Sequence, residues 1–250
     1  MKMNIECVIC FQKQALRALK DTEDINLKQR VLKSVMKMLL EEDWTKTPPE
    51  LANKVYKIVK DLSGIEDPYK DLKQKSNESI LRIYKKLEEE CLDSPNPIQH
   101  ALKLAVAGNI MDFGAIENFD VHNTIEKVMN TKFAYDYSEE LINKLQQSKS
   151  MLYFADNSGE IVFDKLLLSL ILDKYPNLKI TFVVKAEPII NDATMEDVNQ
   201  ISFNNLSNIK FKTLGNLLNL NSTSRKSDEV RKWIDDHDIV IAKGQGNYEG

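Results

Sequence analysis

The stretch MLYFADNSGEIVFD at residues 151–164 decides the fold that we predict. Residues 151–155 are apolar, residues 156–160 are polar and contain a glycine, and an apolar helical pattern then runs from 161 to 175. A short apolar run that ends in a polar turn and a helix is typical of one strand–helix unit of a parallel sheet. The stretch therefore predicts an α/β fold with the polar turn at the carboxyl end of its strand.

Three further candidate strands extend this pattern toward the end of the chain. They lie at residues 178–184, 209–214 and 238–242, and we expect a helix to begin near Asn191. Strands that alternate with helices and read as near-continuous apolar runs indicate a mostly parallel sheet that is covered on both faces. We therefore expect a three-layer α/β/α domain over residues 96–250.

The first part of the chain reads as successive amphipathic helices. Apolar residues recur at helical spacing over 27–39 and 51–62, and one long helix is expected from 68 to 90. Thr47 before two prolines predicts a helix start, and Gly64 predicts a helix end. Core packing explains such stripes, so we expect a helical N-terminal subdomain over residues 1–95 that is mostly scaffold.

The composition excludes several functional classes. The chain has 250 residues, and 34 Lys and Arg against 38 Asp and Glu give a formal net charge of −4. A nucleic-acid partner would require a surplus of basic residues. A membrane partner is not expected either, because no apolar run approaches the roughly 18 residues of a bilayer span. Three cysteines and an N-terminus without a signal-peptide core predict a cytoplasmic protein, and nothing in the sequence indicates its oligomeric state.

Cys7 and Cys10 form a CxxC motif near the N-terminus. On a helix the two thiols would share one face. A thioredoxin-type redox motif would follow a βαβ pattern, which is absent here, and a zinc site would need further ligands, for which Cys91 and three scattered histidines are a weak supply. The alternative is two small apolar residues packed in a helix. These interpretations of the motif remain open.

Polar clusters follow three of the predicted strands, at residues 156–160, 185–192 and 243–247. In open parallel sheets, ligands bind beyond the carboxyl ends of the strands. The clusters contain carboxylate and amide oxygens for a divalent cation, and lysines for an anionic substrate. One such cluster alone is more simply a turn. Three at strand ends favour a site for metal-assisted phosphoryl chemistry.

A fourth cluster, AVAGNIMDFG at residues 105–114, carries Asn109 and Asp112 between glycines. Two interpretations are equally good on spacing alone. The cluster is either a helix C-terminus that ends at a glycine, or it places these two side chains beside the metal or the substrate.

Taken together, these clusters resemble the metal-dependent damage-control phosphatase family, long catalogued as domain of unknown function 89. The resembling segments are AGNIMDFG at 107–114, ADNSGEIVFD at 155–164, VVKAEPIINDAT at 183–194 and AKGQGNYEG at 242–250, while CVIC at 7–10 resembles the CxxC of a microbial and archaeal subgroup. The resemblance implies a helical N-terminal part packed on a Rossmann-like α/β part. It also implies a divalent-metal-dependent hydrolase of phosphate monoesters of small metabolites, such as sugar phosphates or damaged side-products of metabolism.

The resemblance also implies roles for individual residues. Asp156, Asn157 and Asp192 match the metal-binding and catalytic positions, and the metal is expected to be Mn²⁺, Mg²⁺, Co²⁺ or Ni²⁺. The substrate-binding residues that we expect are Asn109, Asp112, Ser158, Glu160, Lys185, Lys243 and Asn247. The chain stops at Gly250, where the family continues with at least another helix and strand, so we expect the C-terminal part of the family domain to be missing.

Two rival functions are compatible with an α/β sheet. A nucleotide-dependent methyltransferase or oxidoreductase would need a GxGxxG after its first strand, and residues 155–159 do not provide one. A non-catalytic binding module for a phosphorylated metabolite would bind the ligand and the metal but release no phosphate.

Overall fold

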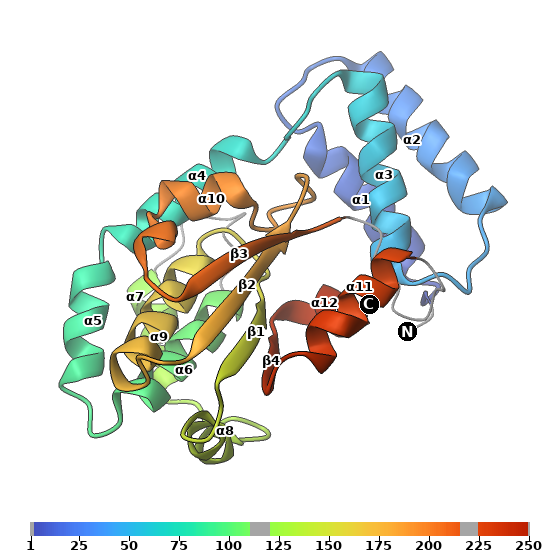
Figure 1. The fold of residues 1–250 in the computed structure, drawn as a ribbon. Coiled ribbons are helices and arrows are strands. Elements are labelled where there is room, and N and C mark those ends of the chain that lie inside the picture. The colour runs from blue at the N-terminus through green and yellow to red at the C-terminus, as the bar shows by residue number, and fades with distance from the viewer. Residues whose placement is uncertain (1–2, 111–120, 216–224, 250) are drawn as a thin grey trace.

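The computed structural model describes residues 3–110, 121–215 and 225–249, and Figure 1 shows its fold. The first part of these residues is helical: α1 Cys7–Ala18, α2 Ile25–Glu41, α3 Pro48–Ser63, α4 Lys70–Leu81, α5 Tyr84–Leu92, α6 Pro97–Ile110, α7 Val121–Met129 and α8 Ser138–Leu145. The rest alternates: β1 Ser150–Phe154, α9 Glu160–Lys174, β2 Lys179–Lys185, α10 Met195–Gln200, β3 Ile209–Leu214, α11 Arg225–Asp235, β4 Ile239–Ala242 and α12 Gly244–Glu249. None of the described helices is long and apolar enough to cross a membrane.

The four strands form one parallel sheet in the order β3-β2-β1-β4. Met151 of β1 pairs with Ile180 on one side and with Ile239 on the other. The chain therefore leaves β1 toward β2 and β3 and later returns to β4 on the opposite side. This reversal next to β1 is the position at which open α/β sheets bind their ligands.

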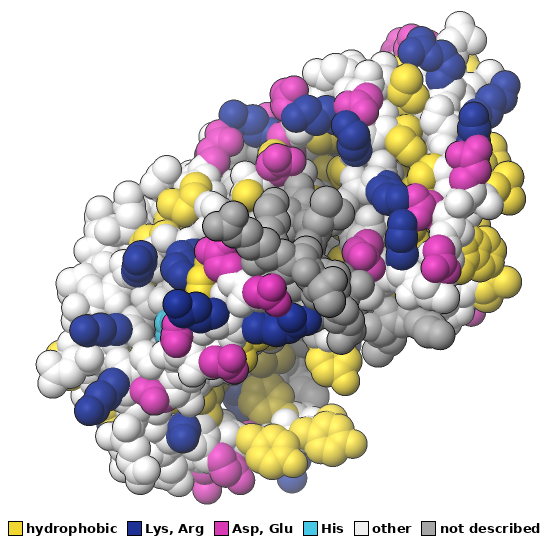
Figure 2. Space-filling view, turned by 45° about the vertical axis from the view of Figure 1, so that its right-hand side comes forward, with side chains coloured by type: hydrophobic (Ala, Val, Ile, Leu, Met, Phe, Trp, Pro, Cys, Tyr) yellow, Lys and Arg dark blue, Asp and Glu magenta, His cyan; other side chains and the backbone are white. Residues whose placement is uncertain are grey.

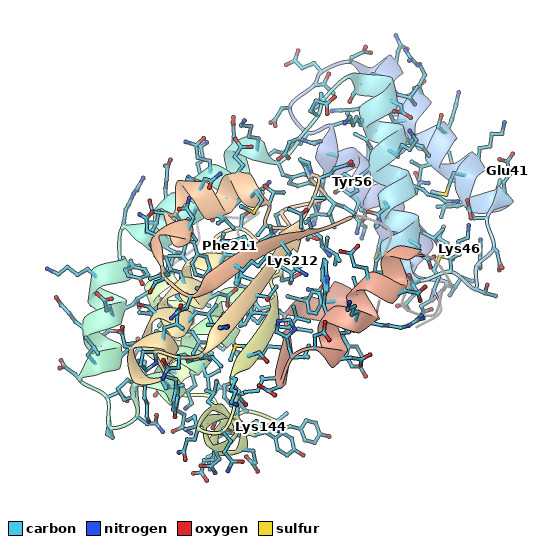
Figure 3. The ribbon with its side chains drawn as sticks, viewed as in Figure 1. Glu41, Lys46, Tyr56, Lys144, Phe211 and Lys212 are labelled. Atoms are coloured by element: carbon cyan, nitrogen blue, oxygen red, sulfur yellow. The ribbon has the colours of Figure 1, made fainter. Side chains whose placement is uncertain are left out.

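Helices cover both faces of the sheet, which confirms the predicted α/β fold with two covered faces. Met151 and Tyr153 belong to the core that also includes residues of α6 and α9, whereas Leu152 and Phe154 pack with Val230 of α11. On the α11 face, the Nζ of Lys212 also lies 3.9 Å from the centre of the Trp233 ring. Figure 3 labels Lys212 beside β3. Both faces of β1 are thus buried, which is why its sequence is continuously apolar.

Helices α1, α2 and α3 enclose a second hydrophobic core, which stands apart at the upper right of Figure 1. Its buried members include Phe11, Val35 and Val55. Tyr69 is the last of them along the chain before the loop residue Ile189. Ile80 on α4 and Leu87 on α5 belong instead to the α/β core. The two cores therefore meet between Tyr69 and Ile80, whereas the domain boundary at residue 95 stays a prediction.

Several local predictions are confirmed. Thr47 and Glu50 form a capping box at the start of α3, and Gly64 ends this helix with a left-handed φ of 73°. The single helix predicted over residues 68–90 is wrong. Arg82 and Ile83 separate α4 from α5, and the amide of Ile83 donates to Ile80 O in a tight turn. The turn redirects the chain so that both helices pack on α9.

Two segments near the strand ends also differ from the prediction. The helix after β2 begins at Met195 rather than near residue 191, because Thr194 and Asp197 form a capping box there. The polar cluster that follows β4 lies largely within a short helix, since Gly244–Glu249 forms α12. On the face shown in Figure 2, acidic and basic side chains are interspersed, and no large basic patch is visible.

Candidate active site

The loops after β1 and β2 are joined through their backbones at the carboxyl edge of the sheet. Asn157 forms an isolated antiparallel bridge with Asp192, and the amide of Ala193 donates to Asp156 O at 2.8 Å. The amide of Ser158 donates to Asn191 O, also at 2.8 Å. These bonds bring together the two segments that supply the predicted metal ligands.

The Asp156 carboxylate is held on several sides. Its Oδ2 accepts hydrogen bonds from Asn109 Nδ2 at 2.8 Å and from Asn157 Nδ2 at 2.7 Å. The backbone of Gly244 lies so close that a β-carbon there would overlap the carboxylate. Burial, together with the nearby carboxylates of Glu160 and Asp192, raises the pKa of Asp156 to about 7. A cation beside this group would favour its ionised form.

Asp192 and Lys185 face each other across the loop that follows β2. The Asp192 Oδ2 atom lies 3.7 Å from Lys185 Nζ, and Lys185 Nζ also lies 3.5 Å from Asn247 Oδ1. Burial raises the pKa of Asp192 to about 6, although the positive charges of Lys185 and Lys73 oppose this shift. Among the described residues, these two long contacts are the only ones of Lys185, so its ammonium group can still donate to an anion.

Lys243 lies behind the Asp156 loop and neutralises two buried acids. Its Nζ is 2.5 Å from Glu160 Oε1 and 2.8 Å from Asp164 Oδ1, and it donates to Ala105 O at 3.1 Å. Burial lowers the pKa of Lys243, but the two carboxylates outweigh it and the pKa lies above its usual value. Asp164 also accepts from the Tyr153 hydroxyl at 2.7 Å. All three ammonium protons of Lys243 therefore have acceptors within the protein.

A second buried network supports the loop from the side of α4. The fully buried Asn77 accepts from Gly159 N at 2.6 Å and donates to Asp197 Oδ1 at 3.0 Å. Ser158 Oγ donates to the same Asp197 oxygen at 2.8 Å, and Lys73 forms an ion pair with Asp197 at 3.2 Å. A neutral amide and a buried ion pair thus fix the backbone that presents Asp156 and Asn157.

A cavity of about 520 Å³ lies between this edge of the sheet and the helical part. We call two of its sides the sheet wall and the helical wall, and Val230 and Ile234 of α11 also border it. The polar residues of the sheet wall are Asp156, Asn157, Lys185, Asn191, Asp192, Gln245 and Asn247. The helical wall consists of Cys7, Cys10, Phe11 and Gln14 on α1 and of Pro48, Pro49, Ala52 and Asn53 on α3.

A family model described as the damage-control phosphatase ARMT1-like domain matches residues 3–250. The chain belongs to this family. It is 33% identical over 256 residues to an uncharacterised protein of Methanocaldococcus jannaschii, covering all of this chain and 83% of that protein. It is 30% identical over 257 residues to a damage-control phosphatase of Pyrococcus horikoshii, covering all of this chain and 86% of the relative.

A solved structure shares the fold of this family member. The structure is that of a protein of the domain-of-unknown-function-89 family from Pyrococcus horikoshii, and it matches with a TM-score of 0.85 and 28% identity over all of this chain and 86% of that chain. The family that the four motifs resemble is therefore confirmed. The CxxC subgroup stays a prediction.

The predicted site residues of this damage-control phosphatase family member occupy three positions relative to the cavity. Those that border it are Asp156, Asn157, Asp192, Lys185 and Asn247. Asn109 and Glu160 contact these residues without bordering the cavity, and Ser158 and Lys243 lie behind the loop. Asp112 lies outside the described residues.

Sequence reasoning missed the residues that support the site from behind. Asp164 is one of these residues, although an acid within the apolar run of a helix is a usable signal. Asn77 and Lys73 carried no such signal, because polar residues are ordinary on an amphipathic helix. Gln14 and Asn53 were missed for the same reason.

The donor atoms fit a hard divalent cation. Within residues 3–110, 121–215 and 225–249, no three Asp, Glu, His or Cys side chains converge as a closed metal site requires. The available donors are the Asp156 and Asp192 carboxylates and the side-chain amide oxygen of Asn157. Such a sparse oxygen set suits an ion that keeps several waters or substrate oxygens, as Mg²⁺ does.

The CxxC pair has no partner for a zinc site among the described residues. Helix α1 begins at Cys7, and Cys7 and Cys10 are free thiols that border the cavity, with Cys10 exposed. Cys91 is fully buried in the α/β core, where burial raises the pKa of its thiol to about 12. It therefore does not join the other two cysteines.

Proposed function

We propose that this protein is a divalent-metal-dependent phosphatase that hydrolyses phosphate monoesters of small metabolites. The observation that carries the proposal is the sheet wall, where Asp156, Asp192 and Lys185 border one cavity at the carboxyl edge of a parallel sheet. Two acids and a lysine suit a cation and a phosphoryl group that lie side by side. Membership of the damage-control phosphatase family supports the same reaction.

Four residues of the sheet wall would have direct roles in this reaction. Asp156, Asn157 and Asp192 would hold the metal, which supplies positive charge to the phosphoryl oxygens and lowers the pKa of water. Lys185 would pair with another phosphoryl oxygen, because its Nζ makes only long contacts within the described residues, at 3.5 Å from Asn247 and 3.7 Å from Asp192. The reaction adds one water across the ester bond and yields an alcohol and inorganic phosphate.

The residues behind the wall keep its geometry fixed during turnover. Asn109 donates to Asp156 and to Glu160, and Asn157 Nδ2 lies 3.0 Å from Glu160 Oε2. Lys243 compensates the negative charge of Glu160, so that this buried carboxylate can orient both amides. Preorganised dipoles of this kind are effective because they need not reorient as the charge develops.

We propose sugar phosphates or phosphorylated side-products of metabolism as substrates. A cavity of about 520 Å³ leaves room for an organic group beyond the phosphate. A relative with 30% identity is named a damage-control phosphatase.

A non-catalytic binding module for a phosphorylated metabolite is the second candidate. One observation favours it. Lys243, which was expected to meet the substrate phosphate, has its protons occupied by Glu160, Asp164 and Ala105 O, and it does not border the cavity. Among the lysines of the four motifs, only Lys185 then borders the cavity.

The test is the release of phosphate from p-nitrophenyl phosphate by protein freed of metal and then given Mn²⁺, Mg²⁺, Co²⁺ or Ni²⁺. We expect turnover only with a metal, and none in the Asp156→Ala variant. Asp61→Ala is the control, since Asp61 is an exposed acid on α3 that forms an ion pair with Lys57. Full metal-dependent turnover by Asp156→Ala would contradict the assignment. Binding of inorganic phosphate without turnover would favour the binding module.

A further inference from the structure

The helical wall contains two polar side chains in an apolar setting. Gln14 on α1 and Asn53 on α3 border the cavity between Phe11, Ala52 and the prolines that begin α3. The side-chain oxygens of both, Gln14 Oε1 and Asn53 Oδ1, are buried and have no hydrogen-bond partner within the part of the chain that the structure describes. Buried amide oxygens without partners are rare, because burial removes their hydrogen bonds to water and no protein hydrogen bond replaces them. Because both side chains border the cavity and are only half-buried, rotation about the terminal torsion of each amide would bring its oxygen to a ligand hydroxyl.

The sheet wall does not present this feature. Its carboxylates and amides bond to one another, as in the contacts of Asp156 with Asn109 and Asn157. A phosphate that meets Lys185 is therefore bound on one side of the cavity. Since the cavity extends from the sheet wall to the helical wall, the organic part of such a substrate would extend toward Gln14 and Asn53.

We propose that Gln14 and Asn53 form the subsite that recognises hydroxyl groups on the organic part of the substrate. They would select polyhydroxylated phosphate esters over apolar ones. A hydroxyl group both donates and accepts, so it satisfies an amide in either orientation, and an apolar chain would leave the amides unpaired. This subsite rests on the proposed function for the phosphate end of the ligand. Gln14 carries more weight, because Asn53 also borders a second cavity on the outer side of α3.

The chain offers a matched control for this proposal. Gln12 lies on the same helix, is also half-buried, and has a buried amide nitrogen without a partner among the described residues, but it does not border the cavity. Gln12→Leu therefore makes the same chemical change as Gln14→Leu at a position where no substrate reaches it.

The experiment compares two esters of similar chain length, glucose 6-phosphate and n-hexyl phosphate, with sorbitol 6-phosphate as a second hydroxylated ester. We expect the wild type to favour the hydroxylated esters in kcat/KM. In Gln14→Leu and Asn53→Leu this preference should fall by about tenfold, mainly through KM, with n-hexyl phosphate unchanged within about twofold. Gln12→Leu should keep the wild-type preference.

A second readout separates recognition from a structural role. Replacing an unpartnered buried amide by an apolar side chain should leave the melting temperature unchanged or raise it. Selectivity that is lost while stability is kept supports the subsite. An unchanged preference in Gln14→Leu, or an equal loss for both esters, would overturn it.

The proposal is also testable if the phosphatase assignment fails. If the wild type hydrolyses none of the esters, calorimetry with the same esters and Mn²⁺ measures binding directly. Weaker binding of sorbitol 6-phosphate by Gln14→Leu, but not by Gln12→Leu, would then support the subsite although the protein is not an enzyme. Equal affinities in both variants would overturn it.

Discussion

The sheet wall and the helical wall face one cavity but differ in how their polar groups are satisfied. On the sheet wall, Asp156 accepts from two amides, and its loop is held from behind by Asn77 and Lys243. On the helical wall, the Gln14 and Asn53 oxygens are buried and unpartnered among the described residues. In the proposed function, the reacting end is organised before a ligand arrives, whereas the proposed subsite on the helical wall is completed by the ligand.

The largest effect is expected from a single methyl group on the sheet wall. In Gly244→Ala the new carbon would overlap the Asp156 carboxylate, and the φ of +77° is strained for any side chain. Because small displacements of reacting groups are costly, we expect kcat/KM for p-nitrophenyl phosphate to fall by about 100-fold or more. Gly246→Ala is the control on the same helix, since a β-carbon there meets no atom within 4 Å. Equal activities of the two variants would contradict the described fit.

Removal of the support behind the sheet wall should reduce stability as well as turnover. Asn77→Leu deprives Gly159 N and Asp197 of buried partners at 2.6 and 3.0 Å. We expect the free energy of unfolding to fall by about 3 kcal/mol in urea denaturation, together with a loss of turnover. Ser79→Ala on the same helix removes a half-buried hydroxyl that donates to Lys75 O of that helix, and it should alter neither. A stable Asn77→Leu variant with normal kinetics would show that the network is dispensable.

Metal binding should stabilise the folded protein through the sheet wall alone. With Mn²⁺ at 100 times its dissociation constant, the stabilisation should be about 2.7 kcal/mol and should appear as a higher melting temperature. Asp192→Asn should lose this metal-dependent shift, and the exposed-site variant Asp61→Asn should keep it. A shift of the same size in Asp192→Asn would remove that residue from the proposed ligands.

The smallest effect is expected far from both walls. Gly64 has a φ of +73°, similar to that of Gly244, but a β-carbon there meets nothing within 4 Å. Gly64→Ala should therefore cost only the strain of the left-handed conformation, about 1 kcal/mol in the free energy of unfolding, and leave kcat/KM unchanged. The pair Gly64→Ala and Gly244→Ala thus separates backbone strain from overlap with the Asp156 carboxylate.

Features with local signals were predictable from the sequence. The strand at residues 151–154 is buried on both faces and so reads as an apolar run, and the Thr47–Glu50 capping box and Gly64 lie within one turn of a helix end. Features that depend on tertiary contacts were not. The break at Arg82 follows from packing on α9, and the inward direction of Lys243 follows from two acids on that helix.

The same limit applies to the helical wall. Gln14 and Asn53 are polar residues on amphipathic helices, and nothing in their sequence context distinguishes a polar residue at a cavity from one in solvent. The polar clusters were predictable because the carboxyl ends of parallel strands meet at one edge. No comparable rule predicts which side chains of a separate layer of helices border the cavity.

Ile189 links the two halves of the molecule. It lies on the loop after β2, three residues before Asp192, yet its side chain is buried in the core formed by α1, α2 and α3. Ile190 packs against the same core and borders the cavity. The folding free energies of the two halves are consequently coupled, so the protein should unfold in one cooperative transition. Loosening the helical core at a distant residue such as Val35 would then weaken cation affinity without touching any ligand.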